Sequence, residues 1–360
     1  MKGHGDIMKK DSFDFLNSLM NTISPSGFEE EAVKVWADRA KTFSDKVETD
    51  IMGSSIAVLN GEGSPRVMIS GHIDEIGFMV QYISEDGYIY FSTIGGIDRH
   101  VLPGQRVWIK TKKGKVLGVI GRKPIHLLED AERNKVAKLE ELWIDIGAKN
   151  AKEAKAAVEV GDPVVCAVGM KMLNKDIAVG RGFDDKAGAF VVNETLSLLS
   201  GKKLKASFAG VATVQEEIGL RGARTSAYGI SPDIGIAVDV TFASDFPLMD
   251  KKKTGDIKIS EGPVIAKGPN INPKVFHLLV ETAKKAKIPY QIEGISRATG
   301  TDANVIQMTR AGVAAALVSI PMRYMHTQVE LISLSDLENS AKLLTAFVLK
   351  LNKGIDFIPG

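Results

Sequence analysis

The strongest constraint on the fold is a change in residue pattern that begins near residue 75 and reverses near residue 171. Outside this middle segment, apolar runs alternate with stretches in which apolar residues recur every three or four positions, a pattern typical of strands that alternate with amphipathic helices. Inside it, short strand-like runs are separated by turns such as Glu85-Asp86-Gly87. The sequence therefore predicts an α/β unit that is interrupted by a small β unit.

The outer segments predict a mixed, largely parallel sheet flanked by helices, because strands as apolar as these are usually covered on both faces. Strands are expected over residues 67–70, 208–214, 234–238 and 314–320, and helices over residues 187–199, 273–287 and 335–351. The short strands of the middle segment favour a small β-barrel or sandwich. We predict an α/β domain of residues 1–74 and 172–360 and an inserted β-barrel domain of residues 75–171.

The charge balance and the cysteine content exclude several classes of protein. Lysine and arginine number 46 against 44 aspartates and glutamates, which leaves a net charge of +2 and no general basic field for nucleic acid or anionic lipid. The single cysteine, Cys166, cannot form an intramolecular disulfide and fits a reducing compartment. No signal peptide is readable, and no apolar run reaches the ~18 residues of a membrane span. We therefore expect a cytoplasmic protein without nucleic-acid or membrane partners.

Histidine and acidic side chains follow the predicted strands at the points where the strands end. They are His72 and Asp74, Glu216 and Glu217, Asp239, and His326 a few residues after a fourth strand. Loops at the carboxyl edge of an open α/β sheet converge on a crevice, so these side chains are expected to meet. Asp184 and Asp185 open a helix, where either could be a plain N-cap, and His72 alone could be a core histidine. Four strand ends that each supply such a residue are harder to ascribe to chance.

The composition of this set suits a catalytic centre with divalent metal ions. Imidazoles and carboxylates without thiolates are typical of a catalytic ion, whereas a closed structural zinc site would favour cysteines. Three carboxylates and two histidines exceed the needs of one open tetrahedral site. They suit two ions about 3.5–4 Å apart that share one carboxylate and a water, with a nearby base to take the proton of that water.

Five segments carry these residues in longer motifs. They are residues 71–78 (GHIDEIGF), 182–188 (GFDDKAG), 215–223 (QEEIGLRGA), 238–240 (VDV) and 324–327 (YMHT). In sequence and in order they resemble the signature segments of the tetrahedral (TET) aminopeptidases, a family of co-catalytic dinuclear metallopeptidases that includes glutamyl and deblocking aminopeptidases. The resemblance spans nearly the whole chain. It implies a zinc-peptidase-like fold and the hydrolysis of N-terminal residues from peptides.

The resemblance also implies a ligand set for two divalent ions, zinc or cobalt. His72, Asp184 and Asp239 would bind one ion. Asp184, Glu217 and His326 would bind the other, so that Asp184 bridges the two.

Two further roles follow from the resemblance. Glu216 would be the general base and acid, and Asp74 would accept a hydrogen bond from His72 and fix its tautomer. Adjacent residues at a strand end point in different directions, so Glu216 can face the water while its neighbour binds metal. Because the bridging aspartate precedes a cis peptide in related peptidases, we expect one between Asp184 and Asp185.

The inserted β domain implies self-association. Proteins that resemble this one use it to dimerise, and six dimers close into a hollow tetrahedral dodecamer that admits unfolded peptides. A dimer or another closed oligomer is the alternative.

Two other functions are open. A cellulase-type glycoside hydrolase (endoglucanase), a label that some relatives carry, would use two carboxylates such as Glu216 and Asp239, but it would leave His72 and His326 without a role. Aromatic residues for a sugar platform make up only 6% of the chain. A non-catalytic assembly subunit would be expected to have lost ligands, and none is missing.

Some features have no firm assignment from the sequence. Residues 300–304 resemble a family motif near the substrate pocket, and Gln307 stands where relatives often have a histidine, which leaves the preferred N-terminal residue open. The remaining histidines are not expected to bind metal; they are His4, His100, His126 and His277. Of these, His277 is expected on the buried side of its helix, and His126 resembles a family segment that approaches a neighbouring subunit.

Overall fold

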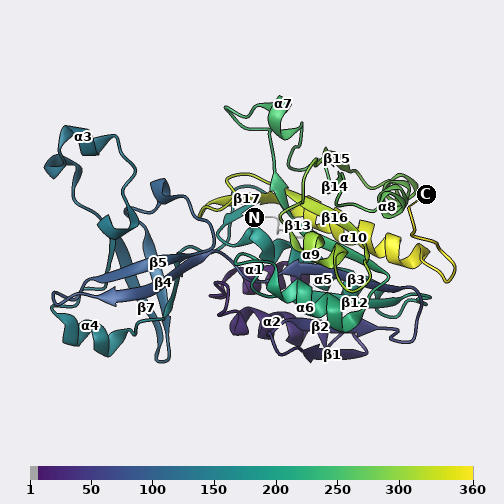
Figure 1. Cartoon of the computed structure of the whole chain (residues 1–360), viewed down its shortest axis with the longest axis horizontal. Helices are drawn as coiled ribbons and strands as arrows, with labels where there is room; N and C mark the ends of the chain where they lie inside the picture. Colours follow the sequence, from purple (N-terminus) through teal and green to yellow (C-terminus); the bar gives the residue numbers. More distant parts are fainter. Residues whose placement is uncertain (1–6, 360) are drawn as a thin grey trace.

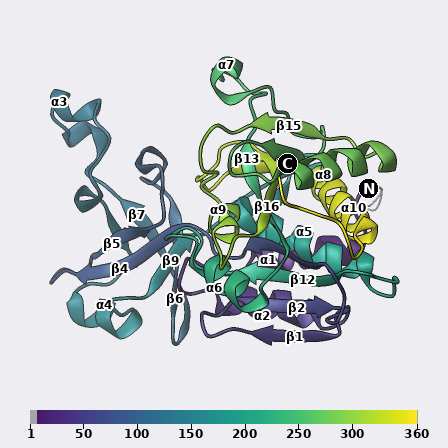
Figure 2. The same cartoon turned by 45° about the vertical axis from the view of Figure 1, so that its right-hand side comes forward.

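A computed structural model describes residues 7–359 of the chain. It consists of an α/β body from which a smaller β-barrel projects on one side, and the two parts stay separate in both views (Figures 1 and 2). His4 lies outside the described residues. None of the helices within residues 7–359 combines the length and the apolar character that crossing a membrane would take.

Eight strands form the central sheet in the order β1-β2-β12-β3-β13-β16-β14-β15. Their bounds are Lys46–Thr49 (β1), Ser55–Leu59 (β2), Arg66–His72 (β3), Ser207–Thr213 (β12), Ile234–Phe242 (β13), Val264–Lys267 (β14), Gln291–Gly294 (β15) and Ala314–Met322 (β16). The four central strands β12, β3, β13 and β16 are parallel, and β2 and β14 pair antiparallel on either side of them. The predicted mixed, largely parallel sheet is confirmed.

Helices cover both faces of this sheet, which explains why its central strands are mostly apolar. One face is covered by α1 (Lys10–Met20), α2 (Glu30–Ala40), α5 (Phe183–Leu199), α8 (Pro273–Ala286) and α10 (Leu334–Lys350). The other face is covered by α6 (Arg221–Ile230) and α9 (Asp302–Gln307). Strand β3 sends Ile69 into the first core and Met68 into the second, as the alternation of a strand requires.

The projecting part is a closed barrel with strand order β4-β5-β8-β7-β6-β9. The bounds are Gly77–Ile83 (β4), Ile89–Ile94 (β5), Arg106–Thr111 (β6), Gly114–Gly121 (β7), Trp143–Asp145 (β8) and Pro163–Cys166 (β9), with short helices α3 (Asp130–Arg133) and α4 (Ala151–Ala157) beside them. The barrel has a hydrophobic core of its own, which includes Phe78, Ile109 and Ile144. An inserted small β-barrel was predicted and is confirmed.

A small antiparallel sheet connects the barrel to the α/β body. It contains β10 (Lys171–Met172), β11 (Ile177–Gly180) and β17 (Glu330–Ser333), none of which was predicted. Strand β11 leads into α5 and β17 leads into α10. Because Gly180 pairs with Glu330, the start of α5 lies beside β17.

Two details of the secondary structure differ from the expectations. Strand β13 does not end at Val238 but continues to Phe242, because its pairing with β16 extends as far as Met322; Asp239 therefore lies inside the strand. His277 is exposed, not buried. It lies two positions from Val275 and from Leu279, which face the core, and residues two apart on a helix do not share a face.

Candidate metal centre

The carboxyl edge of the parallel strands gathers the acidic residues and histidines singled out in the sequence. His72 is the last residue of β3, and its register partner in β12 is Thr213, from which the chain continues to Glu216 and Glu217. Asp239 lies near the end of β13, and His326 follows β16. All of these residues, with Asp184 at the start of α5, line one cleft of about 330 Å³.

Asp184 occupies the centre of the cluster. Its Oδ1 lies 3.1 Å from His72 Nε2, and its Oδ2 lies 3.3 Å from His326 Nε2. His326 Nε2 is also 3.6 Å from Glu217 Oε1. Three groups have ligand atoms within 4.8 Å of one another: His72, Asp184 and Asp239; Asp184, Glu217 and His326; and His72, Glu216 and Glu217. The five residues thus form two adjacent sets that share Asp184.

The backbone at Asp184 has the expected unusual geometry. The peptide bond between Asp184 and Asp185 is cis. Asp185 does not point into the cluster with its neighbour: its Oδ2 accepts a hydrogen bond from the His72 N–H at 3.1 Å, and its Oδ1 accepts one from the Gly188 N–H at 2.9 Å. Asp185 therefore ties the end of β3 to α5 and keeps His72 close to Asp184.

Asp74 is buried beneath the cluster, but its contact with His72 differs from the expected one. His72 Nδ1 lies 3.1 Å from the Asp74 carbonyl oxygen and 3.5 Å from its carboxylate Oδ1. A carbonyl oxygen only accepts, so Nδ1 carries the proton and Nε2 is left free to bind a metal. The Asp74 carboxylate instead accepts hydrogen bonds from the N–H groups of Glu216 (3.0 Å) and Glu217 (3.1 Å) and from the Ser26 hydroxyl (2.7 Å).

Two further carboxylates hold the backbone of this site, and nothing in the sequence indicated either. Glu29 Oε1 accepts a hydrogen bond from the Gln215 N–H at 3.1 Å. The buried Glu330 accepts one from the Asp184 N–H and one from the His326 N–H, both at 3.2 Å. Glu330 thereby links the backbones of two residues whose side chains face each other across the cluster.

The carboxylates of the cleft are crowded and poorly solvated. Burial raises the pKa of Glu216 to about 10, that of Glu217 to about 8 and that of Asp239 to about 7, and repulsion from neighbouring carboxylates adds to the effect. Among residues 7–359, no lysine or arginine lines this cleft. The cluster therefore has an excess of negative groups that positive ions would neutralise.

The pKa values of the two histidines are raised as well, in their case by nearby carboxylates. The hydrogen bond to Asp184 raises the pKa of His326 to about 9. Burial lowers the pKa of His72, but Glu216, Asp184 and Asp74 outweigh burial and hold it well above the usual range. Burial likewise raises the pKa of Asp184, yet its hydrogen bonds to His326 and His72 hold it well below the usual range.

The residues present fit a pair of divalent ions. Glu217 Oε1 is buried and has no hydrogen-bond partner, although a buried carboxylate oxygen normally has one. It points into the set that contains Asp184 and His326. Oxygen and imidazole donors without thiolates are the ligands of catalytic divalent ions.

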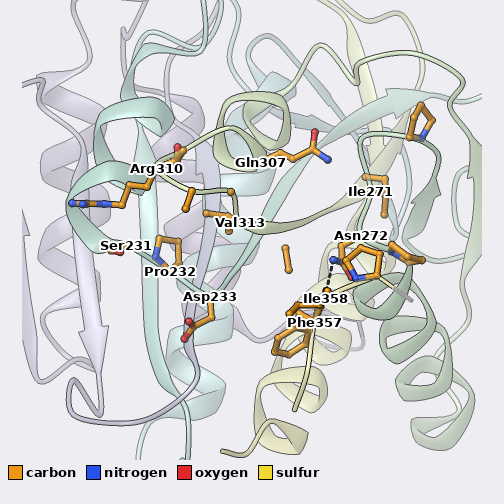
Figure 3. A pocket seen from close by; sticks show the side chains of 17 residues that line it. Ser231, Pro232, Asp233, Ile271, Asn272, Gln307, Arg310, Val313, Phe357 and Ile358 are labelled. Atoms are coloured by element: carbon orange, nitrogen blue, oxygen red, sulfur yellow. Dashed lines mark hydrogen bonds between the residues drawn. The ribbon is translucent and has the colours of Figure 1, made fainter. Parts of the chain in front are cut away.

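The structure also places the residues that the sequence left without an assignment. Gly300 and Thr301 line the same cleft, but Gln307 does not. Gln307 lines a larger pocket of about 750 Å³ beside the starts of β13 and β16, at the opposite edge of the parallel strands (Figure 3). It accepts a hydrogen bond from Asn270. His100 and His126 are exposed in the barrel part, outside the potential metal-binding groups of residues 7–359.

A mixed α/β sheet whose carboxyl edge brings two histidines and several carboxylates into one cleft defines a class, the metal-dependent hydrolases that act on peptide bonds. The family model of M42 glutamyl aminopeptidases matches residues 53–343. The chain belongs to this family, and it is an aminopeptidase.

Curated relatives support this family over nearly their full length. A putative aminopeptidase of Acetivibrio thermocellus is 39% identical over 339 residues, which cover 93% of this chain and 98% of the relative. The lysyl aminopeptidase of Pyrococcus furiosus is 38% identical over 351 residues, 96% of this chain and 99% of the relative.

Solved structures share the fold. A TET aminopeptidase from a marine sediment Thaumarchaeota archaeon has a TM-score of 0.91 and 36% identity, covering 95% of this chain and 97% of that one. The Pyrococcus horikoshii TET1 peptidase has a TM-score of 0.84 and 32% identity, covering 94% of this chain and 100% of that one. It is described as assembling into a tetrahedron or a large octahedral shell. A Thermotoga maritima protein described as an endoglucanase has a TM-score of 0.75 and 31% identity, covering 92% of this chain and 96% of that one. The resemblance to TET aminopeptidases is confirmed.

Proposed function

We propose that this aminopeptidase uses two divalent metal ions, one held by His72, Asp184 and Asp239 and the other by Asp184, Glu217 and His326. The observation that carries the proposal is the position of Asp184, which presents one carboxylate oxygen to each histidine at 3.1 and 3.3 Å. Zinc or cobalt suits these imidazole and carboxylate donors.

Glu216 is the general base in this proposal. Bound ions would polarise the scissile carbonyl and lower the pKa of a water between them. Glu216 lines the cleft, and its Oε2 lies 3.9 Å from His72 Nε2, so it is near the first ligand set. Its carboxylate takes the proton of the attacking water and passes it to the leaving amine.

Asp74 is a positioning residue. Its carbonyl fixes the His72 tautomer, and its carboxylate holds the backbone of Glu216 and Glu217. A carboxylate-rich cleft of this kind also suits the free α-ammonium group of a peptide.

The β-barrel is proposed as the surface through which the chain assembles. We assign residues 75–171 to this dimerisation domain and residues 1–74 and 172–360 to the catalytic domain. Support comes from the TET1 peptidase of Pyrococcus horikoshii, described as a tetrahedral or octahedral assembly. A tetrahedral dodecamer is therefore the assembly we propose. A cytoplasmic location, suggested by the single cysteine, completes the proposal.

Neither alternative explains the site as well. A glycoside hydrolase needs two carboxylates and leaves unexplained why two histidines contact Asp184. A non-catalytic subunit leaves unexplained why Glu217 Oε1 is buried without a hydrogen-bond partner among residues 7–359.

The proposal is tested with a panel of aminoacyl anilides and with cellulose as the alternative substrate. The protein, stripped of metal and then reconstituted with zinc or cobalt, is expected to release the chromophore from at least one anilide and no sugar from cellulose. A chelator should abolish the reaction. Sugar release, or anilide cleavage that withstands complete removal of metal, would overturn it.

A further inference from the structure

We infer that Glu293 makes this enzyme selective for peptides whose N-terminal residue is basic, lysine or arginine. This inference rests on the proposed function, because it assigns the side-chain subsite of the same cleft. Glu293 lies on β15, and together with Thr241, Phe242 and Ile295 it lines the part of the cleft beyond the proposed ligands.

The position of Glu293 relative to the proposed metal ligands is fixed by β13. Its Oε2 accepts a hydrogen bond from the Thr241 hydroxyl at 2.9 Å. Thr241 follows Asp239 by two residues on β13, so the two side chains point to the same face, about 7 Å apart along the strand. The Glu293 carboxylate is therefore one side-chain length beyond the proposed ligand cluster.

Substrate geometry decides which group reaches Glu293. The α-amino group and the scissile carbonyl carbon of an N-terminal residue are both attached to its Cα, so both must lie at the proposed metal centre. Two parts of the substrate extend away from that centre, the side chain of the N-terminal residue and the leaving peptide, and we assign the side chain to the part of the cleft that Glu293 lines. A lysine or arginine stem has the necessary length and places a cation at its end.

The wall along this path matches such a side chain. The same cleft is lined by Phe242, Ile295, Leu317 and Met325, whose apolar surfaces suit an aliphatic stem. Glu293 is half-buried, and burial raises the pKa of its carboxyl group. No lysine, arginine or histidine of residues 7–359 forms an ion pair with it; its one hydrogen bond is from Thr241. A cation at the end of the substrate's side chain would form an ion pair with the Glu293 carboxylate and neutralise its negative charge.

The inference is tested by kcat/KM for lysyl and norleucyl anilides on the metal-loaded enzyme. Norleucine has the four-carbon stem without the ammonium group, so the ratio of the two values isolates the charge. We expect lysine to be preferred about tenfold or more, as a charge-assisted hydrogen bond would provide. Glu293→Gln keeps the size and an acceptor for Thr241. It should remove the preference by lowering the lysyl value while leaving the norleucyl value unchanged.

A matched variant and a binding measurement separate the possible failures. Glu281→Gln changes an exposed glutamate on α8 and should leave the ratio as it is. In calorimetry, free lysine should bind the Glu216→Gln protein more tightly than free norleucine, and Glu293→Gln added to that protein should abolish the difference. Cleavage of norleucyl anilide with no lysine preference, or a preference that Glu293→Gln leaves intact, would overturn the inference and leave the proposed function standing. Failure to cleave any anilide would overturn both.

Discussion

Asp74 Oδ1 accepts a hydrogen bond from the backbone N–H of Glu216 at 3.0 Å. The other oxygen of the same carboxylate binds the Glu217 N–H at 3.1 Å, and Glu29 binds the Gln215 N–H at 3.1 Å. Three consecutive amides are therefore held by two buried carboxylates. Gln215 itself has a φ of 57°, a left-handed conformation that a side-chain-bearing residue rarely adopts. The turn that carries the proposed base and a proposed ligand is thus fixed by acids from two distant segments.

Asp74→Asn is expected to lower kcat/KM by about 10–100-fold, as is usual when a residue that orients metal ligands is changed. The asparagine keeps one acceptor oxygen, but its NH₂ group would face a backbone N–H in either orientation, that of Glu216 or that of Glu217. The measurement is steady-state hydrolysis of an anilide together with metal titration. Ser26→Ala removes only the 2.7 Å bond to the same carboxylate and should have a smaller effect. Equal effects of the two variants would contradict this view of Asp74.

Glu216→Gln is expected to leave both ions bound and to lower kcat by at least ~10²–10⁴-fold, because the amide cannot take a proton from water. Metal content after gel filtration and the rate on an anilide are the two measurements. Glu217→Gln is the informative comparison, since Glu217 is proposed as a ligand: this variant should lose metal affinity as well as rate. A Glu216→Gln enzyme of full activity would show that the base has been assigned to the wrong glutamate.

Metal-free protein should become less stable as the pH rises from about 5 to 9. A carboxyl group whose pKa is higher in the folded protein binds its proton more tightly when folded, and this stabilisation is lost as the pH rises toward the folded value. The pKa rises from 3.8 to about 7 at Asp239 and from 4.5 to about 8 at Glu217. His326, raised from 6.5 to about 9, acts in the same direction.

Bound ions should reverse this trend, because they bind the deprotonated ligands and their affinity increases with pH. The measurement is the melting temperature at each pH, with a chelator and with zinc. The difference between the two curves should widen toward high pH. If the melting temperatures with chelator and with zinc differed by the same amount at every pH, metal ions would not be bound by these carboxylates.

Four of the five proposed ligands could be predicted because each follows or ends an apolar run whose strand nature is plain from the sequence, whereas Asp184 was found at the opening of a helix. His72 and Glu217 are examples, and the sheet topology then brings them together at one edge. The β-barrel was similarly readable, since short turns join β4 to β5 and β6 to β7. Asp239 was placed one residue past its strand because pairing with β16, which sets the true end of β13, is a tertiary effect.

The supporting residues could not have been predicted. Glu330 reaches Asp184 only because β17, four residues long, pairs with β11 some 150 residues earlier in the chain. Glu29 lies at the start of α2, where an acidic residue is ordinary and carries no signal. Such contacts depend on the packing of segments that are distant in sequence, and local patterns do not contain that information.

Glu75→Gln is expected to destabilise the folded protein by about 3–5 kcal/mol, since it leaves buried cations without their partner. Glu75 is buried next to Asp74, and its carboxylate pairs with Arg181 and, at 2.8 Å, with the fully buried Lys186. Chemical denaturation gives the free energy of unfolding. Glu30→Gln is the control, because Glu30 is exposed and pairs with Lys110 at 3.4 Å; its effect should stay below about 1 kcal/mol. Similar losses for the two variants would contradict the structural role of Glu75.

Gly71→Ala tests whether close approach of β3 and α5 positions His72. A Cβ at Gly71 would lie 2.4 Å from the Gly188 carbonyl carbon and 2.5 Å from the Ala189 nitrogen, so the strand or the helix must move. That movement would stretch the hydrogen bond between Asp185 and the His72 N–H, which spans the same gap.

We expect Gly71→Ala to cost about 1–3 kcal/mol or more of folding free energy, as overpacking does, and to weaken metal binding as well. Thermal unfolding and calorimetric titration with zinc measure the two effects. Gly229→Ala is the matched control, because a Cβ at this helical position meets no atom within 4 Å and should be neutral or stabilising. If Gly71→Ala lowered stability but left zinc affinity unchanged, His72 would not depend on this contact for its position.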